Sequence, residues 1–160
     1  MILDERLEFA DAVSVVGTAG AAALLSNFDV IDLGADPTLR DIGNGEDLWL
    51  VITTDTEVIT AGAAGTIVFS LVSDSTANLA TSPTTHLSSP SLVTDDAGAN
   101  SAALNAGGLI FAAKLPLGSY ERYLGILTTI GTTDTTAGKV NAFLTKDVAK
   151  WTALPNAVGA

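Results

Sequence analysis

Apolar and polar side chains alternate along several short stretches of the chain. The clearest is residues 66–73, in which Ile67, Phe69 and Leu71 occupy every second position. Because successive side chains of a β-strand point to opposite faces, this spacing predicts a strand with one face in a hydrophobic core. Residues 139–146 repeat the pattern, with valine, alanine and leucine on the apolar face.

Similar stretches recur along the chain, separated by segments rich in glycine, proline, aspartate and asparagine, which favour turns. The strong strand candidates are residues 28–33, 48–54, 66–73, 109–115, 121–130 and 139–146, and the weaker ones are 12–16 and 85–88. About eight short strands with this spacing predict an all-β protein with a jelly-roll or other Greek-key β-sandwich fold. The strand order stays open, because both topologies produce the same alternation.

The two ends of the chain lack this alternation, so we expect extended terminal arms on one β-sandwich domain. The predicted boundaries are residues 1–10 for the N-terminal arm, 11–150 for the sandwich and 151–160 for the C-terminal tail. In the arm, Leu3, Leu7 and Ala10 also fit a short helical turn. Residues 74–105, rich in threonine, serine, alanine and glycine, predict a long surface loop.

Several blocks of the sequence, taken in order, also occur in a known family. They are MILDER at 1–6, EFAD at 8–11, VIDL at 30–33, RDIG at 40–43, LPLGSYERYLG at 115–125 and GKVNAFLT at 138–145. In this ordered set the chain resembles the cement, or decoration, proteins of tailed-phage capsids, the family named for the Bordetella phage capsid cement protein. Residues 73–105 match no block of that family, so nothing is carried over there.

The resemblance implies a jelly-roll fold and a structural role in the virion. It implies binding to the outer surface of a capsid built from an HK97-like major capsid protein, which the chain stabilises by bridging capsid subunits. The expected partners are that major capsid protein and a second copy of the chain, with a dimer favoured over a trimer. No nucleic acid and no membrane is expected as a partner. The expected location is the outer capsid surface, after synthesis in the cytoplasm of the bacterial host.

Candidate partner contacts come from the arm, from residues 117–123, from the strand candidate 139–146 and from the tail that begins at Trp151. They are Leu3, Arg6, Phe9, Tyr120, Arg122, Tyr123, Phe143 and Trp151. Tyrosine suits a half-buried surface, because its ring is apolar and its tip is polar. Alternatives stay open: both tyrosines fit the edge of the core, Phe143 fits a site covered by a loop of its own domain, and Trp151 fits docking on its own domain.

The net charge of −11 disfavours nucleic acid, because a negative protein repels phosphate. Residues 1–113 hold 15 acidic and two basic side chains, whereas residues 114–160 hold three acidic and five basic ones. This imbalance favours solubility or the docking of oppositely charged neighbours. The longest weakly polar run, residues 12–25, falls short of the roughly 20 residues that a membrane helix needs.

The residues that carry chemistry form no motif for catalysis or metal binding. The chain has no cysteine, His86 is its only histidine, and no GxSxG elbow is present. Asp55 and Glu57 lie two residues apart but outside any DxDxDG calcium loop, and no phosphate-binding glycine motif occurs. We therefore expect no enzyme, catalytic residue, cofactor or metal. The alternative to a capsid protein is a non-enzymatic binding module of carbohydrate-binding or adhesin type.

Overall fold

The computed structural model describes residues 5–20, 22–23, 29–35, 42, 47–95 and 98–148. Apart from two 3-10 turns, η1 (Glu5–Leu7) and η2 (Ala102–Leu104), the regular structure of these residues is β. The strands are β1 (Glu8–Ser14), β2 (Ala22–Ala23), β3 (Ile31–Asp32), β4 (Trp49–Thr60), β5 (Gly65–Asp74), β6 (Thr84–Ser88), β7 (Leu92–Thr94), β8 (Leu109–Lys114), β9 (Tyr123–Gly131) and β10 (Thr135–Thr145). The predicted all-β class is confirmed.

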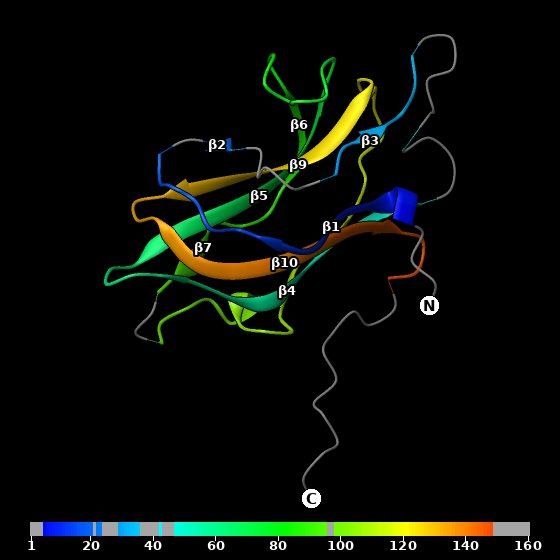
Figure 1. Cartoon of the computed structure of the whole chain (residues 1–160). Coiled ribbons are helices and arrows are strands. Elements are labelled where there is room, and N and C mark those ends of the chain that lie inside the picture. Colours follow the sequence, from blue (N-terminus) through cyan, green and yellow to red (C-terminus); the bar gives the residue numbers. More distant parts are fainter. Residues whose placement is uncertain are drawn as a thin grey trace, which may run out of the picture.

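The strands form two antiparallel sheets that face each other (Figure 1). One sheet has the order β1-β10-β4-β8, and the other has the order β2-β9-β5-β6, with β3 also on β9 and β7 also on β5. β2 and β3 pair with successive parts of β9, and β6 and β7 with successive parts of β5. Each of these two pairs of strands therefore occupies a single position in the sheet.

Counted in this way, the described strands fill eight positions. Numbered along the chain, they run first–eighth–third–sixth in one sheet and second–seventh–fourth–fifth in the other. This is the strand order of a jelly roll, in which the first and last strands are neighbours. The structure thus confirms the predicted β-sandwich and decides the strand order that the alternation leaves open.

The hydrophobic core lies between the two sheets. Ile67, Phe69 and Leu71 of β5 enter it from one sheet, as the alternation predicts, and Val140 and Ala142 of β10 enter it from the other. Each of these five side chains exposes at most 1% of its surface. Burying alternate side chains of paired strands on one inner face is the main source of stability in such a sandwich.

Two strands extend further than their composition predicts. β4 continues to Thr60, and β10 begins at Thr135 within a segment whose glycines and threonines predict a turn. The register between these two strands shifts at several points, one of them across Gly138, which has φ 135°. A bulge and a turn both favour glycine. Composition alone therefore does not separate a bulged strand from a turn.

The predicted surface loop at residues 74–105 contains β6, already a weak strand candidate, and also β7 and η2. β7 has three residues and is too short to show an alternation. At the N-terminal end, the segment assigned to an arm holds the single turn η1 and the start of β1. Leu3 and the tail at 151–160 lie outside the described residues.

Candidate functional site

Arg122 lies directly before β9 and pairs with Asp32 of β3, 90 positions away in the sequence. Its Nε donates to Oδ1 at 3.0 Å and its Nη2 donates to Oδ2 at 2.8 Å. The guanidinium carbon lies 4.8 Å from the centre of the Tyr123 ring. Two hydrogen bonds and this cation–π contact fix the plane of the guanidinium group. Hydrogen bonding to Asp32 raises the pKa of Arg122.

A groove of about 500 Å³ adjoins this ion pair. Its lining residues are Glu5, Arg6, Glu8, Asp29, Val30, Ile31 and Asp32. Burial raises the pKa of Glu8, and the charges of Asp11, Glu5 and Asp29 raise it further. The groove therefore carries an excess of negative charge, which favours cationic groups over anionic ones.

Ser73, at the end of β5, connects three segments through one hydroxyl. Its Oγ accepts a hydrogen bond from the Glu121 N–H at 3.1 Å and lies 2.8 Å from His86 Nε2. The serine oxygen has two lone pairs, so beside the Glu121 N–H it can accept a proton from Nε2 or donate its own proton to Nε2, depending on the His86 tautomer. The His86 ring lies 4.2 Å from the Tyr120 ring, centre to centre.

A serine hydroxyl at hydrogen-bonding distance from a histidine is the first element of a nucleophilic triad. Here Ser73 has no exposed surface. The nearby Glu121 carboxylate accepts a hydrogen bond from Thr84 Oγ1 at 3.1 Å. A nucleophile without exposed surface cannot meet a substrate in this conformation. The contacts tie β5 and β6 to the segment before β9.

Acidification is expected to weaken the fold through His86. Burial lowers the pKa of His86 from its ordinary value of 6.5, and the charge of Glu121 opposes this only in part. The neutral ring contributes its full stability above pH 6.5, the ordinary pKa of histidine. As the pH falls from 6.5 through the lower pKa of the folded state, this contribution is lost, because His86 of the unfolded chain takes up a proton first.

His86→Gln tests this expectation, because the glutamine amide can donate to Ser73 or accept from it and does not titrate. In urea unfolding at about pH 7.5 and about pH 5, we expect the variant to lose less stability on acidification than the wild type does. Equal losses in the two proteins would assign the acid sensitivity to other groups.

Three of the predicted contact residues, Tyr120, Arg122 and Tyr123, lie together at the start of β9. Tyr120 is 7% exposed, and its hydroxyl donates to the Pro116 carbonyl at 2.6 Å. Burial raises the pKa of this hydroxyl. Arg6 lines the groove that also contains Asp32, the partner of Arg122. The arginines at positions 6 and 122 thus belong to one end of the sandwich.

Two other predicted contact residues are buried in the isolated chain. Phe9 of β1 has no exposed surface and belongs to the core. Phe143 of β10 is 3% exposed and stands on the outer face of its sheet, because its neighbours Ala142 and Leu144 face the core. Leu3 and Trp151 lie outside the described residues. Contact of any of these residues with a partner stays a prediction.

Leu117 begins the predicted contact segment 117–123 but is not among the individually predicted contact residues, and it is 73% exposed. It stands between Pro116 and Gly118 in the turn before Tyr120. An apolar residue inside such a turn is the feature of the sequence that indicates an exposed apolar side chain here. No local signal marks Asp32 or Ser73. Their partners come from distant parts of the sequence.

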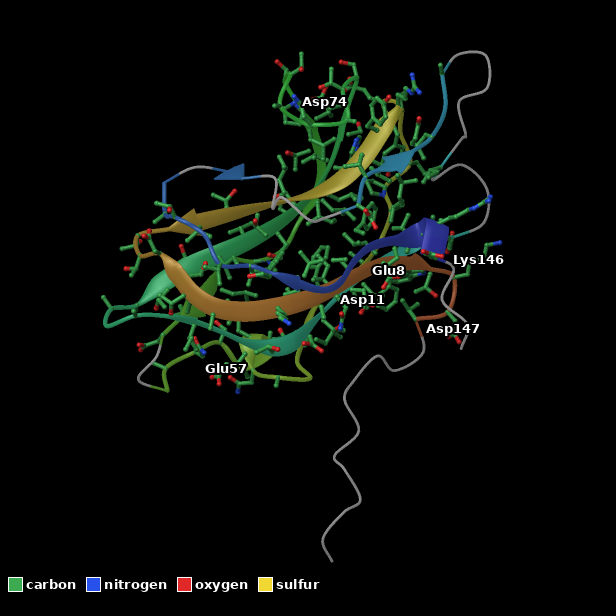
Figure 2. The ribbon with its side chains drawn as sticks, viewed as in Figure 1. Glu8, Asp11, Glu57, Asp74, Lys146 and Asp147 are labelled. Carbon is green, nitrogen blue, oxygen red and sulfur yellow. The ribbon has the colours of Figure 1, made fainter. Side chains whose placement is uncertain are left out.

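The fold interleaves the acidic and basic parts of the sequence. β10, from the basic part, lies between β1 and β4 of the acidic part, and β9 lies between β3 and β5. Figure 2 shows Glu8, Asp74 and Glu57 on well-separated parts of the molecule, with Lys146 and Asp147 near Glu8. The uneven charge of the sequence does not divide the described surface into one acidic and one basic half.

Comparisons with known proteins place this architecture in a family. The sequence model of the family described as Bbp16 matches residues 9–144, a span that runs from β1 to β10. No curated protein matches the chain. Among the described residues, no group of three or more histidine, aspartate or glutamate side chains is arranged to hold a metal ion. No helix of the described part is long and apolar enough to cross a bilayer.

Proposed function

The chain belongs to the Bbp16 family, whose name points to a Bordetella phage protein, and on this premise we propose that it is a capsid cement protein of a tailed phage. It binds the outer surface of an HK97-like capsid and stabilises the shell by bridging capsid subunits. The observation that carries this proposal is the family match, which covers both sheets of the jelly roll.

The proposed mechanism is thermodynamic linkage. A protein that binds the assembled shell but not free capsid subunits stabilises the shell by its free energy of binding. A standard contact buries about 800 Å² on each partner, and many copies repeat it over the shell. A β-sandwich suits the binding of a capsid, because its two packed sheets hold the contact residues in one geometry.

We place the capsid contact at the end of the sandwich that presents Arg122 and Leu117. Arg122 is oriented by Asp32 and Tyr123, and its side chain is 43% exposed, so it is available to a partner at small ordering cost. Leu117 adds exposed apolar surface a few residues away. Orientated arginine and apolar groups are frequent among residues that dominate protein interfaces.

The contacts of Ser73 and of Tyr123 favour a structural role over hydrolysis and over carbohydrate binding. Ser73 is fully buried, which opposes hydrolysis through the Ser73–His86 pair. A carbohydrate-binding module stacks sugars on an open aromatic ring, whereas Arg122 lies over the ring of Tyr123. We therefore propose that the chain is not an enzyme and that its ligand is another protein.

Co-sedimentation with purified undecorated capsids tests the proposal. The wild-type chain is expected to pellet with the capsids and to raise the temperature at which they come apart. Arg122→Ala is expected to weaken binding about tenfold or more. Lys139→Ala, which removes the same charge from an exposed position on β10, serves as the matched control and is expected to bind as the wild type does. A wild-type chain that stays in the supernatant contradicts the function, whereas normal binding by Arg122→Ala contradicts only the assigned surface.

A further inference from the structure

The segment between β8 and β9, residues 116–121, carries the exposed Leu117 and leads into Arg122. Backbone hydrogen bonds hold the chain on both sides of this segment, one through the Leu115 N–H and one through the Arg122 carbonyl, each at 2.8 Å. Within the described part of the chain, residues 116–121 themselves form no hydrogen bond from backbone to backbone. The position of the segment therefore depends on contacts with side chains.

The side chains that hold the segment come from β5 and β6. The Glu121 N–H donates to Ser73 Oγ at 3.1 Å, and the Glu121 carboxylate accepts the Thr84 hydroxyl at 3.1 Å. The Tyr120 ring belongs to the core and lies 4.2 Å from the His86 ring, centre to centre. His86 Nε2 lies 2.8 Å from the same Ser73 Oγ. The His86 ring thus contacts both Tyr120 of the segment and the hydroxyl that receives the Glu121 N–H.

The titratable and charged groups around His86 come from two elements. β5 contributes Asp74, whose carboxylate is bound within the turn that follows it. The segment before β9 contributes Glu121, the neutral Tyr120 and Arg122, whose guanidinium is held in the ion pair described above. β6 itself carries no other titratable residue. Burial lowers the pKa of His86 and outweighs the charge of Glu121, which raises it, so this arrangement favours the neutral ring.

Protonation changes the hydrogen bond that His86 can form with Ser73. The neutral ring can accept the serine proton at Nε2, whereas an imidazolium carries N–H groups on both nitrogens and accepts none. Ser73 has no exposed surface, so its proton cannot turn to water when this acceptor is lost. Movement of the segment away from the sheet would open both side chains to water and remove this cost.

We propose that Ser73 and His86 form a pH-sensitive latch, which positions residues 116–121 for the capsid contact and releases them when His86 is protonated, while the two sheets stay folded. The release is a local opening, and it costs less free energy than global unfolding because it breaks only the contacts of one segment. Below pH 6.5, the ordinary pKa of histidine, protonation favours the open form. The role in capsid contact rests on the function proposed above, whereas the opening concerns the chain alone.

Hydrogen exchange at the Glu121 amide tests the latch. Exchange rates measured at about pH 7.5 and about pH 5, compared with the intrinsic rate at each pH, give the protection factor of this amide. At both pH values the Glu121 amide is expected to be less protected than the core amides of β5 and β10. Its protection factor is expected to fall about twofold or more on acidification. Circular dichroism at both pH values verifies that the sheets stay folded.

Three variants separate the latch from other effects of acid. In His86→Gln, which does not titrate, the protection of the Glu121 amide is expected to change less with pH than in the wild type. Ser73→Ala removes the acceptor of the Glu121 N–H and is expected to lower this protection at both pH values. Thr133→Ala is the matched control, because it removes a hydroxyl that donates to the Ala64 carbonyl at 3.2 Å beyond the other end of β9. It is expected to protect Glu121 as the wild type does.

A protection factor of Glu121 that does not fall with pH in the wild type overturns the latch, and so does an equal fall in His86→Gln. Protection as high as that of the core amides overturns the local opening. Co-sedimentation with undecorated capsids at both pH values tests the link to the contact: the wild type is expected to lose about twofold or more affinity relative to His86→Gln on acidification. Equal losses overturn that link. A wild type that binds capsids at neither pH contradicts the proposed function alone, because the exchange measurements still decide the latch.

Discussion

Replacing Phe9 with alanine is expected to lower the free energy of unfolding by about 3–5 kcal/mol. Phe9 has no exposed surface and packs in the core between the two sheets, although its strand, β1, is an edge strand. Truncation removes the transfer free energy of the ring and leaves a cavity that neighbouring side chains only partly fill. Domains of this size are stable by about 5–15 kcal/mol, so the loss is a large fraction of the total.

Urea unfolding, followed by tryptophan fluorescence or circular dichroism, measures this effect. Phe9→Leu, which keeps most of the apolar volume, is expected to lose much less stability than the alanine variant. Leu117→Ala removes an apolar side chain that is 73% exposed and is expected to change stability by less than about 0.5 kcal/mol. A loss for Phe9→Ala as small as that for Leu117→Ala would contradict the assignment of Phe9 to the core.

This prediction also bears on how a capsid contact in the N-terminal segment can be tested. Weak capsid binding by Phe9→Ala would report unfolding, because the side chain is buried within the chain itself. Arg6 lines the groove at the surface and is the better position for substitution. Capsid binding by an Arg6→Ala variant that unfolds as the wild type does would measure the contact alone.

Gly138→Ala is expected to cost about 2–5 kcal/mol, from backbone strain and overpacking together. Gly138 lies in the bulged part of β10 with φ 135°, a conformation that residues with a Cβ rarely adopt. An added Cβ would stand 2.7 Å from Val58 Cγ2 and 2.8 Å from Val58 Cα. The second contact is with backbone of β4, so it cannot be relieved by turning a side chain.

Gly20→Ala separates the two causes. Gly20 also has positive φ, at 106°, but no atom lies within 4 Å of the position that its Cβ would take. Its substitution is therefore expected to cost only the backbone strain, about 1–2 kcal/mol. Thermal or urea unfolding of both variants gives the comparison. Equal losses would show that the close approach of β10 to β4 at Val58 does not matter for stability.

The part of the fold that could be predicted is the part that local spacing encodes. Ile67, Phe69 and Leu71 face the core because side chains alternate along any strand, whatever lies beside it. The bulges of β4 and β10 escaped prediction, because the glycine that permits them also signals a turn. β7 escaped because three residues are too few for a period to appear.

The candidate site was predicted only in part, for a similar reason. Tyr120, Arg122 and Tyr123 drew attention because they are unusual residues in one short block. The residues that orient them come from elsewhere: Asp32 is 90 positions from Arg122, and Ser73 lies 48 positions from Glu121. Which residue meets which depends on the register of paired strands, and no local pattern contains that register.

The sequence by itself determined that this protein is a β-sandwich, that Ile67, Phe69 and Leu71 face its core, and the family to which its ordered blocks belong. These properties follow from side-chain type and spacing along the backbone. Only the tertiary structure decided the jelly-roll strand order and the burial of Phe9 and Ser73. These depend on which distant segments pack together, and many arrangements of the same alternating strands bury the same apolar faces.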